Sequence, residues 1–440
     1  MSKIENKGYR LWRKSLKVIP GGNGLLSKRP ERYAGNIWPT YFEKASGINL
    51  IDLSGKKWID FAQMGLGSAI LGYNNKELNR YVTKFINKGI NTTLNCPEEY
   101  YLAKKLIEHN PFSKFVRFSR SGGEAMSMSV RIARARTQSS KVAFSGYHGW
   151  HDWYLATNLS IKDGLKDQLL PGLKTNGVPK NLKNTAFPFS FNSIKDLKKI
   201  IKKNNDLKII ILEGARNTII SSEMSEYLNY LKNNKNFVII VDEITSGLRT
   251  SLSGAYKLSK LIPNIAVYGK ALGNGFAINA IVGDEIMDVS QDTFMSSSFH
   301  TERVGFVAAL KTLEIINREK LWKQLKNNGI KIIKSYLLIA KKYNIKLTTN
   351  NFYPLPSFQF NYGNNNQIYN TYIIQEFLKH NILASNSVYL SMAHDQKNIN
   401  KYLTIYEKIM EQLSEIIKNK VKKENFLEIS EIDTGFKRLT

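Results

Sequence analysis

A carboxylate and a lysine each follow an apolar run in this chain. Residues 237–241 lead to Asp242, and residues 265–268 lead to Lys270, 28 residues after Asp242. A carboxylate at the end of a buried strand is costly unless a charged partner uses it. If the two runs form neighbouring parallel strands, both side chains leave the same edge of one sheet. Such a pair suits a cofactor that carries a protonated ring nitrogen and an aldehyde.

A glycine-rich loop precedes a helical pattern at residues 125–137. Ser121, Gly122 and Gly123 form this loop. Glycines let the backbone approach an anion closely, and the free N–H groups of a first helical turn favour a phosphate there. A glycine-rich helix entry without any ligand is the alternative that the loop alone leaves open.

An aromatic segment follows the strand-like run 141–145. Tyr147 or His148, at the carboxyl end of that strand, could stack on a flat ring bound in the crevice there. A loop that is merely packed is the alternative. His148 and His151 also raise the question of a metal. Only Asp152 lies at ligand spacing and the chain has one cysteine, so we expect no metal.

The neighbouring carboxylates Asp242 and Glu243 could also bind Mg²⁺, as in a nucleotide hydrolase. No Gly-x-x-x-x-Gly-Lys-Ser/Thr sequence precedes them, which argues against that interpretation. The order of phosphate loop, ring-stacking aromatic, aspartate and lysine instead matches what pyridoxal 5'-phosphate needs. The residue types therefore predict a site for this cofactor, with Lys270 and Asp242 as its catalytic residues.

Strand-like and helical patterns alternate through the middle of the chain. The strand-like runs lie at residues 141–145, 209–212, 237–241, 265–268 and 280–282. Helical stretches at 193–204 and 224–233 separate several of them, which predicts an α/β fold with a mainly parallel central sheet covered by helices. A long helical segment at about 303–343 leads into a mixture of short strands and helices.

These patterns predict a large and a small domain. Residues 51–305 form the large domain, which would bind the cofactor. Residues 306–440 form a smaller α+β domain, and residues 1–50 join it as an N-terminal segment.

The formal net charge of +28 raises the question of a nucleic-acid partner. The lysines lie in scattered pairs on predicted helix surfaces, without an arginine-rich stripe and interleaved aromatics, so we expect no such partner. A non-catalytic basic binding protein is the alternative that the charge alone suggests. We expect neither a secretion signal nor a membrane span, because no apolar run has the required length. Cys96 is the one cysteine, which fits a reducing cytoplasm.

The chain resembles the class III aminotransferases, pyridoxal-phosphate enzymes of fold type I, and most of all their glutamate-1-semialdehyde 2,1-aminomutase-like branch. The similarity covers almost the whole chain. The matching stretches are Ile19–Gly22, Ser121–Ala125, Tyr147–Gly149, Asp242–Arg249 and Gly269–Lys270. The resemblance implies that Lys270 bonds to the cofactor aldehyde, that Asp242 faces the ring nitrogen, and that Tyr147 lies against the ring.

The resemblance also implies a homodimer, because Ser298 aligns with a threonine that reaches the cofactor phosphate of the partner subunit. Gly123 stands where the family's Ser-Gly-Thr-Glu-Ala loop has threonine, so one phosphate-binding hydroxyl is lost. In the aminomutases an arginine for the substrate carboxylate follows the N-terminal glycines. Lys28 or Arg29 could serve here, and His300 could face the substrate.

The sequence therefore predicts a pyridoxal-phosphate-dependent aminotransferase or aminomutase that acts on a small amino, keto or aldehyde compound. Racemisation or decarboxylation with the same cofactor is the alternative, because the turn at residues 298–303 departs from the family's Gly-Asn-Pro pattern. The identities of the amino donor and acceptor stay open.

Overall fold

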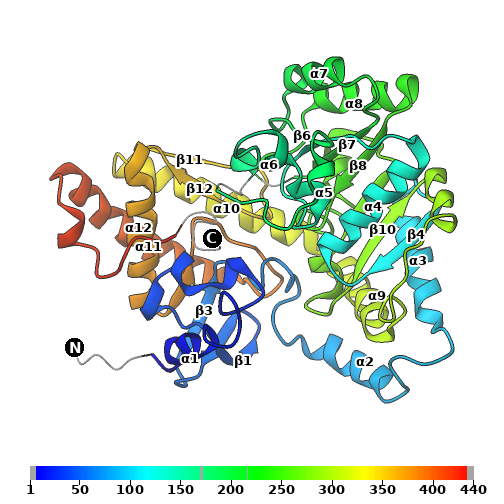
Figure 1. Ribbon diagram of the computed structural model, residues 1–440. Helices are drawn as coiled ribbons and strands as arrows, with labels where there is room; N and C mark the ends of the chain where they lie inside the picture. Colours follow the sequence, from blue (N-terminus) through cyan, green and yellow to red (C-terminus); the bar gives the residue numbers. More distant parts are fainter. Residues whose placement is uncertain (1–5, 169–171, 216, 434–440) are drawn as a thin grey trace. The chain divides into compact units, whose positions relative to one another are not determined.

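The computed structural model describes residues 6–168, 172–215 and 217–433 (Figure 1). These residues form two compact units. The larger unit contains residues 76–322, and the smaller unit contains residues 6–75 and 323–433. The units divide after residues 75 and 322, whereas the sequence patterns place domain boundaries after residues 50 and 305.

The larger unit is built on a seven-stranded sheet in the order β4-β10-β9-β8-β7-β5-β6. Its strands are β4 (Phe115–Ser119), β5 (Val142–Ser145), β6 (Ala186–Pro188), β7 (Ile209–Glu213), β8 (Val238–Asp242), β9 (Ile265–Tyr268) and β10 (Asn279–Gly283). The pairs from β6 to β9 are parallel, and β10 is antiparallel to both of its neighbours. The mainly parallel central sheet predicted from the sequence is confirmed.

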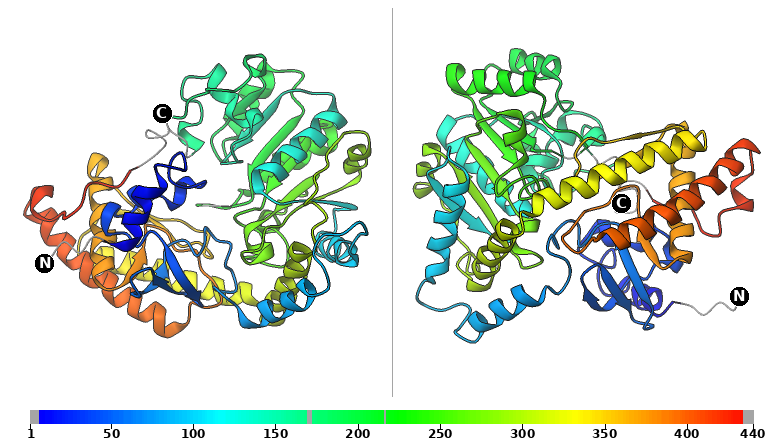
Figure 2. Two further views of the ribbon diagram at one scale, coloured as in Figure 1. Left: turned by 60° about the horizontal axis from the view of Figure 1, so that its bottom comes forward. Right: turned by 180° about the vertical axis from the view of Figure 1, so that it is seen from behind.

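Helices of the larger unit cover this sheet (Figure 2). The helices of this unit are α2 (Lys76–Ile86), which packs on α9, and α3 (Pro97–His109), α4 (Gly122–Thr137), α5 (Asp152–Leu155), α6 (Thr157–Ser160), α7 (Ile194–Lys203), α8 (Ser222–Lys235) and α9 (Arg303–Arg318). Every residue of β7 and β8 is buried, because helices lie against both faces of a parallel sheet. Alternate residues of the central strands, such as Ile209 and Ile211, form one apolar core with Met126 and Val130 of α4.

The smaller unit combines a four-stranded sheet, in the order β1-β2-β3-β13, with helices. Its elements are α1 (Lys7–Ser15), β1 (Phe42–Ser46), β2 (Asn49–Asp52), β3 (Lys57–Phe61), β11 (Leu347–Thr349), β12 (Phe358–Phe360), α11 (Asn366–Lys379), β13 (Ile382–Ala384) and α12 (Gln396–Lys418). The turn between β2 and β3 forms because the Asp52 carboxylate accepts the N–H groups of Ser54 and Lys56, at 2.8 and 3.1 Å.

The prediction of one continuous helical segment at residues 303–343 is wrong at residues 319–320, where the helix is interrupted. The structure has two helices, α9 and α10 (Leu321–Lys342), instead. Lys320, between them, has a φ of 46°, in the left-handed region, which ends the first helix. In the described part of the chain, no helix is both long enough and apolar enough to cross a membrane.

Candidate active site

Asp242 is the last residue of β8, and its buried carboxylate has a polar contact at each oxygen. Its Oδ1 accepts the N–H of Ile244 at 3.0 Å, and its Oδ2 lies 2.9 Å from Nδ1 of His148. The other ring nitrogen of His148 lies 3.2 Å from the carbonyl of Ser145. Oδ2 of Asp242 is an acceptor, so the ring donates to it through the N–H at Nδ1. His148 thus orients the carboxylate from the end of β5.

Lys270 lies beyond the end of β9, the parallel neighbour of β8. It begins a single 3-10 turn, Lys270–Gly273, and has a φ of 43°. A residue with a side chain is strained in that region by about 1–2 kcal/mol, and such strain concentrates at functional sites. Nζ of Lys270 donates to Oγ1 of Thr245 at 2.7 Å. The amine is therefore held beside the loop that follows Asp242.

The side chain of Ile244, in the loop after β8, lies beside both the start of α4 and the loop after β9. A Cβ atom on Gly122 would lie 3.0 Å from Cδ1 of Ile244, and one on Gly269 would lie 3.3 Å from Cγ2 of Ile244. A Cβ atom on Gly269 would also lie 2.0 Å from Oδ1 of Asn279, so no larger residue fits there. These contacts bring the glycine loop, the aspartate and the lysine of the sequence prediction to one edge of the sheet. Motif reasoning assigned no role to Ile244 and Thr245, although both lie in the matching stretch Asp242–Arg249, and none to Asn279. Ile244 and Asn279 act through packing, and Thr245 acts through its hydrogen bond with Lys270.

The phosphate-loop candidate forms the N-terminus of α4. Ser121 is the N-cap residue, and Oε2 of Glu124 accepts the backbone N–H groups of Arg120 and Ser121, at 2.9 and 3.4 Å. The N–H groups of Gly122 and Gly123 belong to the first turn, where a helix provides no partner of its own. They can therefore bind an anion.

The aromatic segment lies against this loop. A Cβ atom on Gly149 would lie 2.8 Å from the Cα of Gly123, and Gly149 has a φ of 99°, so glycine is required there. Tyr147 is partly exposed, and its ring meets that of Tyr154 edge to face, with centroids 6.2 Å apart. Its backbone N–H donates to Oε2 of Glu213 at 3.4 Å.

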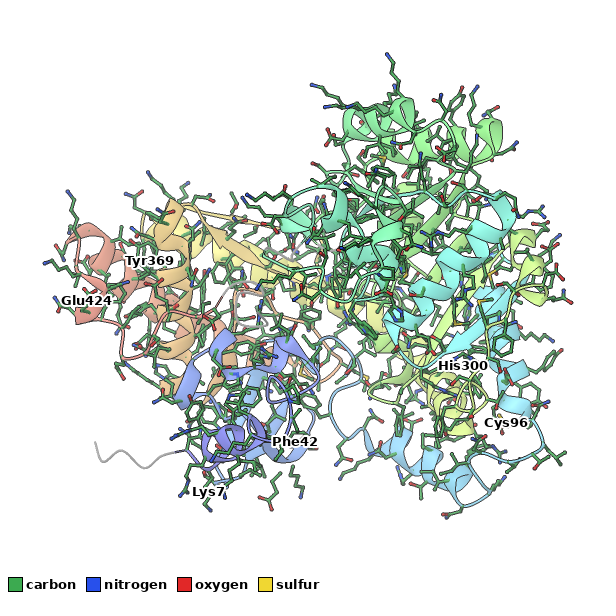
Figure 3. The ribbon with its side chains drawn as sticks, in the orientation of Figure 1. Lys7, Phe42, Cys96, His300, Tyr369 and Glu424 are labelled. Atoms are coloured by element: carbon green, nitrogen blue, oxygen red, sulfur yellow. The ribbon has the colours of Figure 1, made fainter. Side chains whose placement is uncertain are left out.

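The turn at residues 298–303 reaches the same helix end through His300 (Figure 3). Nε2 of His300 lies 3.0 Å from Oε1 of Glu124. Although burial opposes the shift, the hydrogen bond with His300 and the backbone N–H donors lower the pKa of Glu124. The Arg120 guanidinium donates to the carbonyls of residues 277, 299, 300 and 302, which fixes the turn. Ser298 is exposed, and its carbonyl accepts from Nδ2 of Asn91 at 3.2 Å.

Lys28 and Arg29 belong to the smaller unit, and their surroundings differ. Lys28 is exposed at the end of a short 3-10 turn, Leu26–Lys28. The guanidinium of Arg29 lies over Gly21, where a Cβ atom would come within 2.0 Å of Nη2. Nε of Arg29 is buried, with no hydrogen-bond partner among the described residues. A buried donor of this kind calls for an acceptor.

Glu243 points away from these groups although it follows Asp242 directly. Its Oε1 accepts the N–H of Tyr256 at 2.8 Å, and burial raises its pKa to about 7. Within the described ranges, no three His, Cys, Asp or Glu side chains gather closely enough to hold a metal ion. The grouped residues fit pyridoxal phosphate instead. The first turn of α4 can hold the phosphate, Asp242 offers a buried carboxylate, and Lys270 supplies an amine.

The fold is that of the fold type I pyridoxal-phosphate transaminases. The FumI protein of Sphingopyxis sp. MTA144, solved in its PLP internal aldimine form, matches with a TM-score of 0.83 at 18% identity, covering 97% of this chain and 98% of that one. A glutamate-1-semialdehyde aminomutase from Pseudomonas aeruginosa PAO1 matches with a TM-score of 0.79 at 14% identity, covering 93% and 95%.

Residues 32–348 match the family model of class-III aminotransferases, and the chain belongs to this family. It is 33% identical over 325 residues to 3-aminobutyryl-CoA aminotransferase of Cloacimonas acidaminovorans, covering 72% of this chain and 74% of the relative. It is 30% identical over 435 residues to glutamate-1-semialdehyde 2,1-aminomutase of Nitrosopumilus maritimus, covering 90% and 97%. The predicted class of enzyme and its cofactor, pyridoxal phosphate, are confirmed.

Proposed function

We propose that this enzyme transfers an amino group from a small amino donor to a keto or aldehyde acceptor, with Lys270 and Asp242 as its catalytic residues. The observation that supports this most strongly is the pairing of β8 with β9. Asp242, held by His148, and Lys270 follow neighbouring parallel strands. When bound, pyridoxal phosphate supplies an electron sink for the bond broken at the substrate carbon.

Each residue then has a distinct task. The Asp242 carboxylate accepts from His148 and Ile244, so it stays an acceptor that can keep a proton on the ring nitrogen of the cofactor. Lys270 would hold the cofactor through its aldehyde group. The Nζ of Lys270 would also be the base that takes a proton from the substrate carbon and returns it. Thr245 holds that amine at 2.7 Å and so limits its positions.

Transfer between two molecules is proposed in preference to movement of the amine within one molecule. The relative with 33% identity is an aminotransferase, while four aminomutase relatives share 28–30%. The test is to load the enzyme with pyridoxal phosphate, add one amino donor, and follow the visible absorbance and the release of a keto or aldehyde product. An acceptor added afterwards should restore the spectrum.

Two results would contradict this proposal. An isomer of the substrate formed without a released keto product would identify an aminomutase. A wild-type protein that takes up no pyridoxal phosphate would overturn the site itself. Lys270→Ala, which lacks the amine, is the matched negative control in both assays.

We also propose a homodimer in which Ser298 reaches the cofactor phosphate of the partner subunit. Asn91 ties the loop around residue 90 to the Ser298 turn. Apolar side chains on these two segments face solvent in the single chain: Leu94 is 81% exposed and Phe299 is 63% exposed. A second copy of this chain would cover them.

Sedimentation of the wild-type protein and of Leu94→Glu/Phe299→Glu tests the dimer. The double variant should sediment as a monomer and bind pyridoxal phosphate more weakly. Leu338→Glu, at an exposed position of the smaller unit, is the control and should remain dimeric. A wild-type monomer with full cofactor occupancy would refute this proposal without affecting the roles of Lys270 and Asp242.

A further inference from the structure

His151 lies where a side chain at position 123 would extend. A Cβ atom on Gly123 would lie 3.0 Å from Cδ2 and 3.3 Å from Nε2 of His151, and 3.6 Å from Cδ1 of Trp150. The ring of His151 stacks on that of Trp150, with centroids 4.4 Å apart and an interplanar angle of 26°. The imidazole edge that carries Nε2 therefore takes the place of the missing side chain at the first turn of α4.

The backbone is shaped to allow this approach. Gly149 lacks a side chain where a Cβ atom would lie 2.8 Å from the Cα of Gly123, so the loop that carries His151 lies directly on the glycine loop. A Cβ atom at position 123 would already lie 3.0 Å from the ring, so a threonine there, as the family has it, would require the imidazole to shift. Gly123 and His151 together therefore occupy the space that a threonine side chain at position 123 would fill.

His151 differs from the other two histidines of the site in its hydrogen bonding. His148 is held on both sides by Asp242 and Ser145, and His300 is held by Glu124. Neither ring nitrogen of His151 has a hydrogen-bond partner in the described part of the chain. Burial lowers the pKa of His151, while the carboxylates of Glu124 and Asp152 oppose that shift. In either protonation state the imidazole keeps an N–H that can donate to an anion.

We propose that Nε2 of His151 donates a hydrogen bond to the phosphate of pyridoxal 5'-phosphate, in place of the hydroxyl that the loop lacks at Gly123. The inference rests on the proposed role of the glycine loop as the phosphate site. It makes His151 a cofactor-binding residue of this chain. A hydrogen bond to a charged oxygen is among the stronger ones, so its loss should be measurable as affinity.

Two probes that differ only in the phosphate test this role: pyridoxal 5'-phosphate and pyridoxal. Their dissociation constants are measured by absorbance titration of the apoenzyme. His151→Ala should weaken pyridoxal phosphate binding about tenfold or more and leave pyridoxal binding unchanged. Trp150→Phe, which keeps an aromatic neighbour beside an intact imidazole, is the control and should bind both probes like the wild-type protein. Equal losses for both probes would overturn the proposal, because His151 would then support the loop or the ring.

A swap of the two residues is the second test. Gly123→Thr alone should bind pyridoxal phosphate poorly, because its side chain meets the imidazole. Gly123→Thr combined with His151→Ala should recover most of the affinity that His151→Ala loses, since the hydroxyl then has both space and a ligand. No recovery in a folded double variant, judged by its unchanged affinity for pyridoxal, would overturn the proposal. A wild-type protein that binds neither probe would instead overturn the cofactor site as a whole.

Discussion

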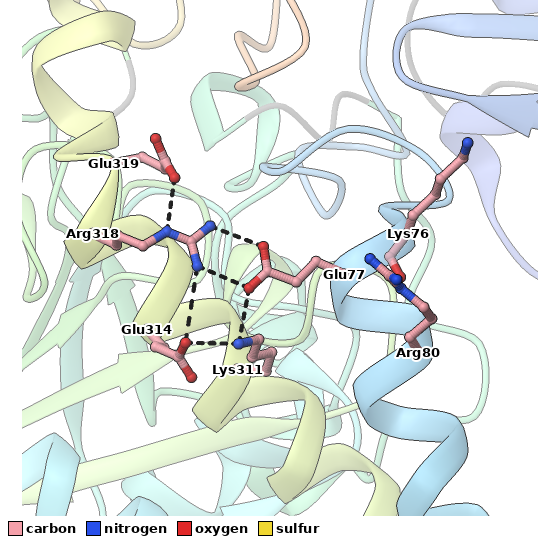
Figure 4. Close-up of polar contacts among 7 residues, drawn as sticks. All are labelled: Lys76, Glu77, Arg80, Lys311, Glu314, Arg318 and Glu319. Carbon is pink, nitrogen blue, oxygen red and sulfur yellow. Dashed lines mark hydrogen bonds and ion pairs between the residues drawn. The ribbon is translucent and has the colours of Figure 1, made fainter.

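The edge of the sheet at β8 and the contact between α2 and α9 both concentrate charge, but they expose it very differently. At the end of β8, the side chains of His148 and Asp242 are 0% and 6% exposed, and each has a fixed set of partners. Between α2 and α9, Glu77 is 37% exposed and Arg318 is 49% exposed, and their partners overlap (Figure 4). A buried carboxylate that loses its hydrogen-bond partner is costly, whereas solvent and alternative partners make a surface ion-pair network tolerant of substitution. Substitutions at the two places should therefore differ by orders of magnitude in effect.

The largest effect is expected for Lys270→Ala. The variant loses both the bond to the cofactor and the proton transfer at the substrate carbon, so amino transfer should fall by about 10⁴-fold or more. Steady-state rates measure this, with the visible spectrum of the bound cofactor as a second readout. Lys257→Ala, which removes a lysine that donates to the carbonyl of His109, is the control and should keep its activity. Substantial transfer by Lys270→Ala would exclude Lys270 as the catalytic amine.

Asp242→Asn should produce the next largest effect. The amide keeps the size of the side chain but cannot hold a proton on the ring nitrogen, so kcat should fall by about 10²- to 10³-fold. Glu243→Gln is a matched control, because Glu243 is the adjacent buried carboxyl and contacts Tyr256 instead of the site. Burial raises its pKa to about 7, so near neutral pH the carboxyl group is already neutral in part of the molecules. Equal losses in the two variants would mean that Asp242 acts only in folding.

A smaller effect, on KM, is expected for only one of the two substrate-binding candidates, Arg29 and Lys28. Arg29 has a buried Nε without a partner in the described residues, and Lys28 is exposed. Arg29→Ala should raise KM for a carboxylate substrate by about tenfold to a hundredfold with little change in kcat, while Lys28→Ala should leave both constants unchanged. The comparison requires a donor with a carboxylate and a matched amine without one. An Arg29→Ala variant that loses both donors equally would contradict carboxylate binding.

The strands and helices that carry the site could be predicted from the sequence, whereas the side-chain contacts within the site could not. The apolar runs before Asp242 and Lys270 indicate buried parallel strands, and the structure confirms β8 and β9 as neighbours. The contact of Thr245 with Lys270 and the position of His151 over Gly123 depend on how loops from different strands approach each other. No residue spacing encodes such approaches. The break at Lys320 was missed for a related reason, since a left-handed residue without glycine leaves no pattern.

The smallest effect is expected in the surface network. Glu77 of α2 pairs with Lys311 at 2.9 Å and with Arg318 at 2.8 Å, and hydrogen bonds from these two residues lower its pKa to about 2 (Figure 4). Because the folded-state pKa is depressed, this stabilisation is present above the ordinary value of about 4.5 and is lost as the pH falls toward 2. Glu77→Gln should lower the free energy of unfolding at pH 7 by only about 1 kcal/mol or less, since solvent screens exposed pairs.

Denaturant unfolding at pH 7 and pH 3, in low and high salt, measures this contribution. The difference between wild type and Glu77→Gln should shrink at pH 3 and at high salt, because protonation and screening each remove the same attraction. Lys76→Gln changes the neighbouring residue of α2, which has no ion pair with this network, and serves as the control. A loss of several kcal/mol that salt does not change would mean that the α2–α9 contact depends on packing around Glu77. The difference between this network and the His148–Asp242 pair at β8 would then come from how the side chains pack and not from how exposed they are.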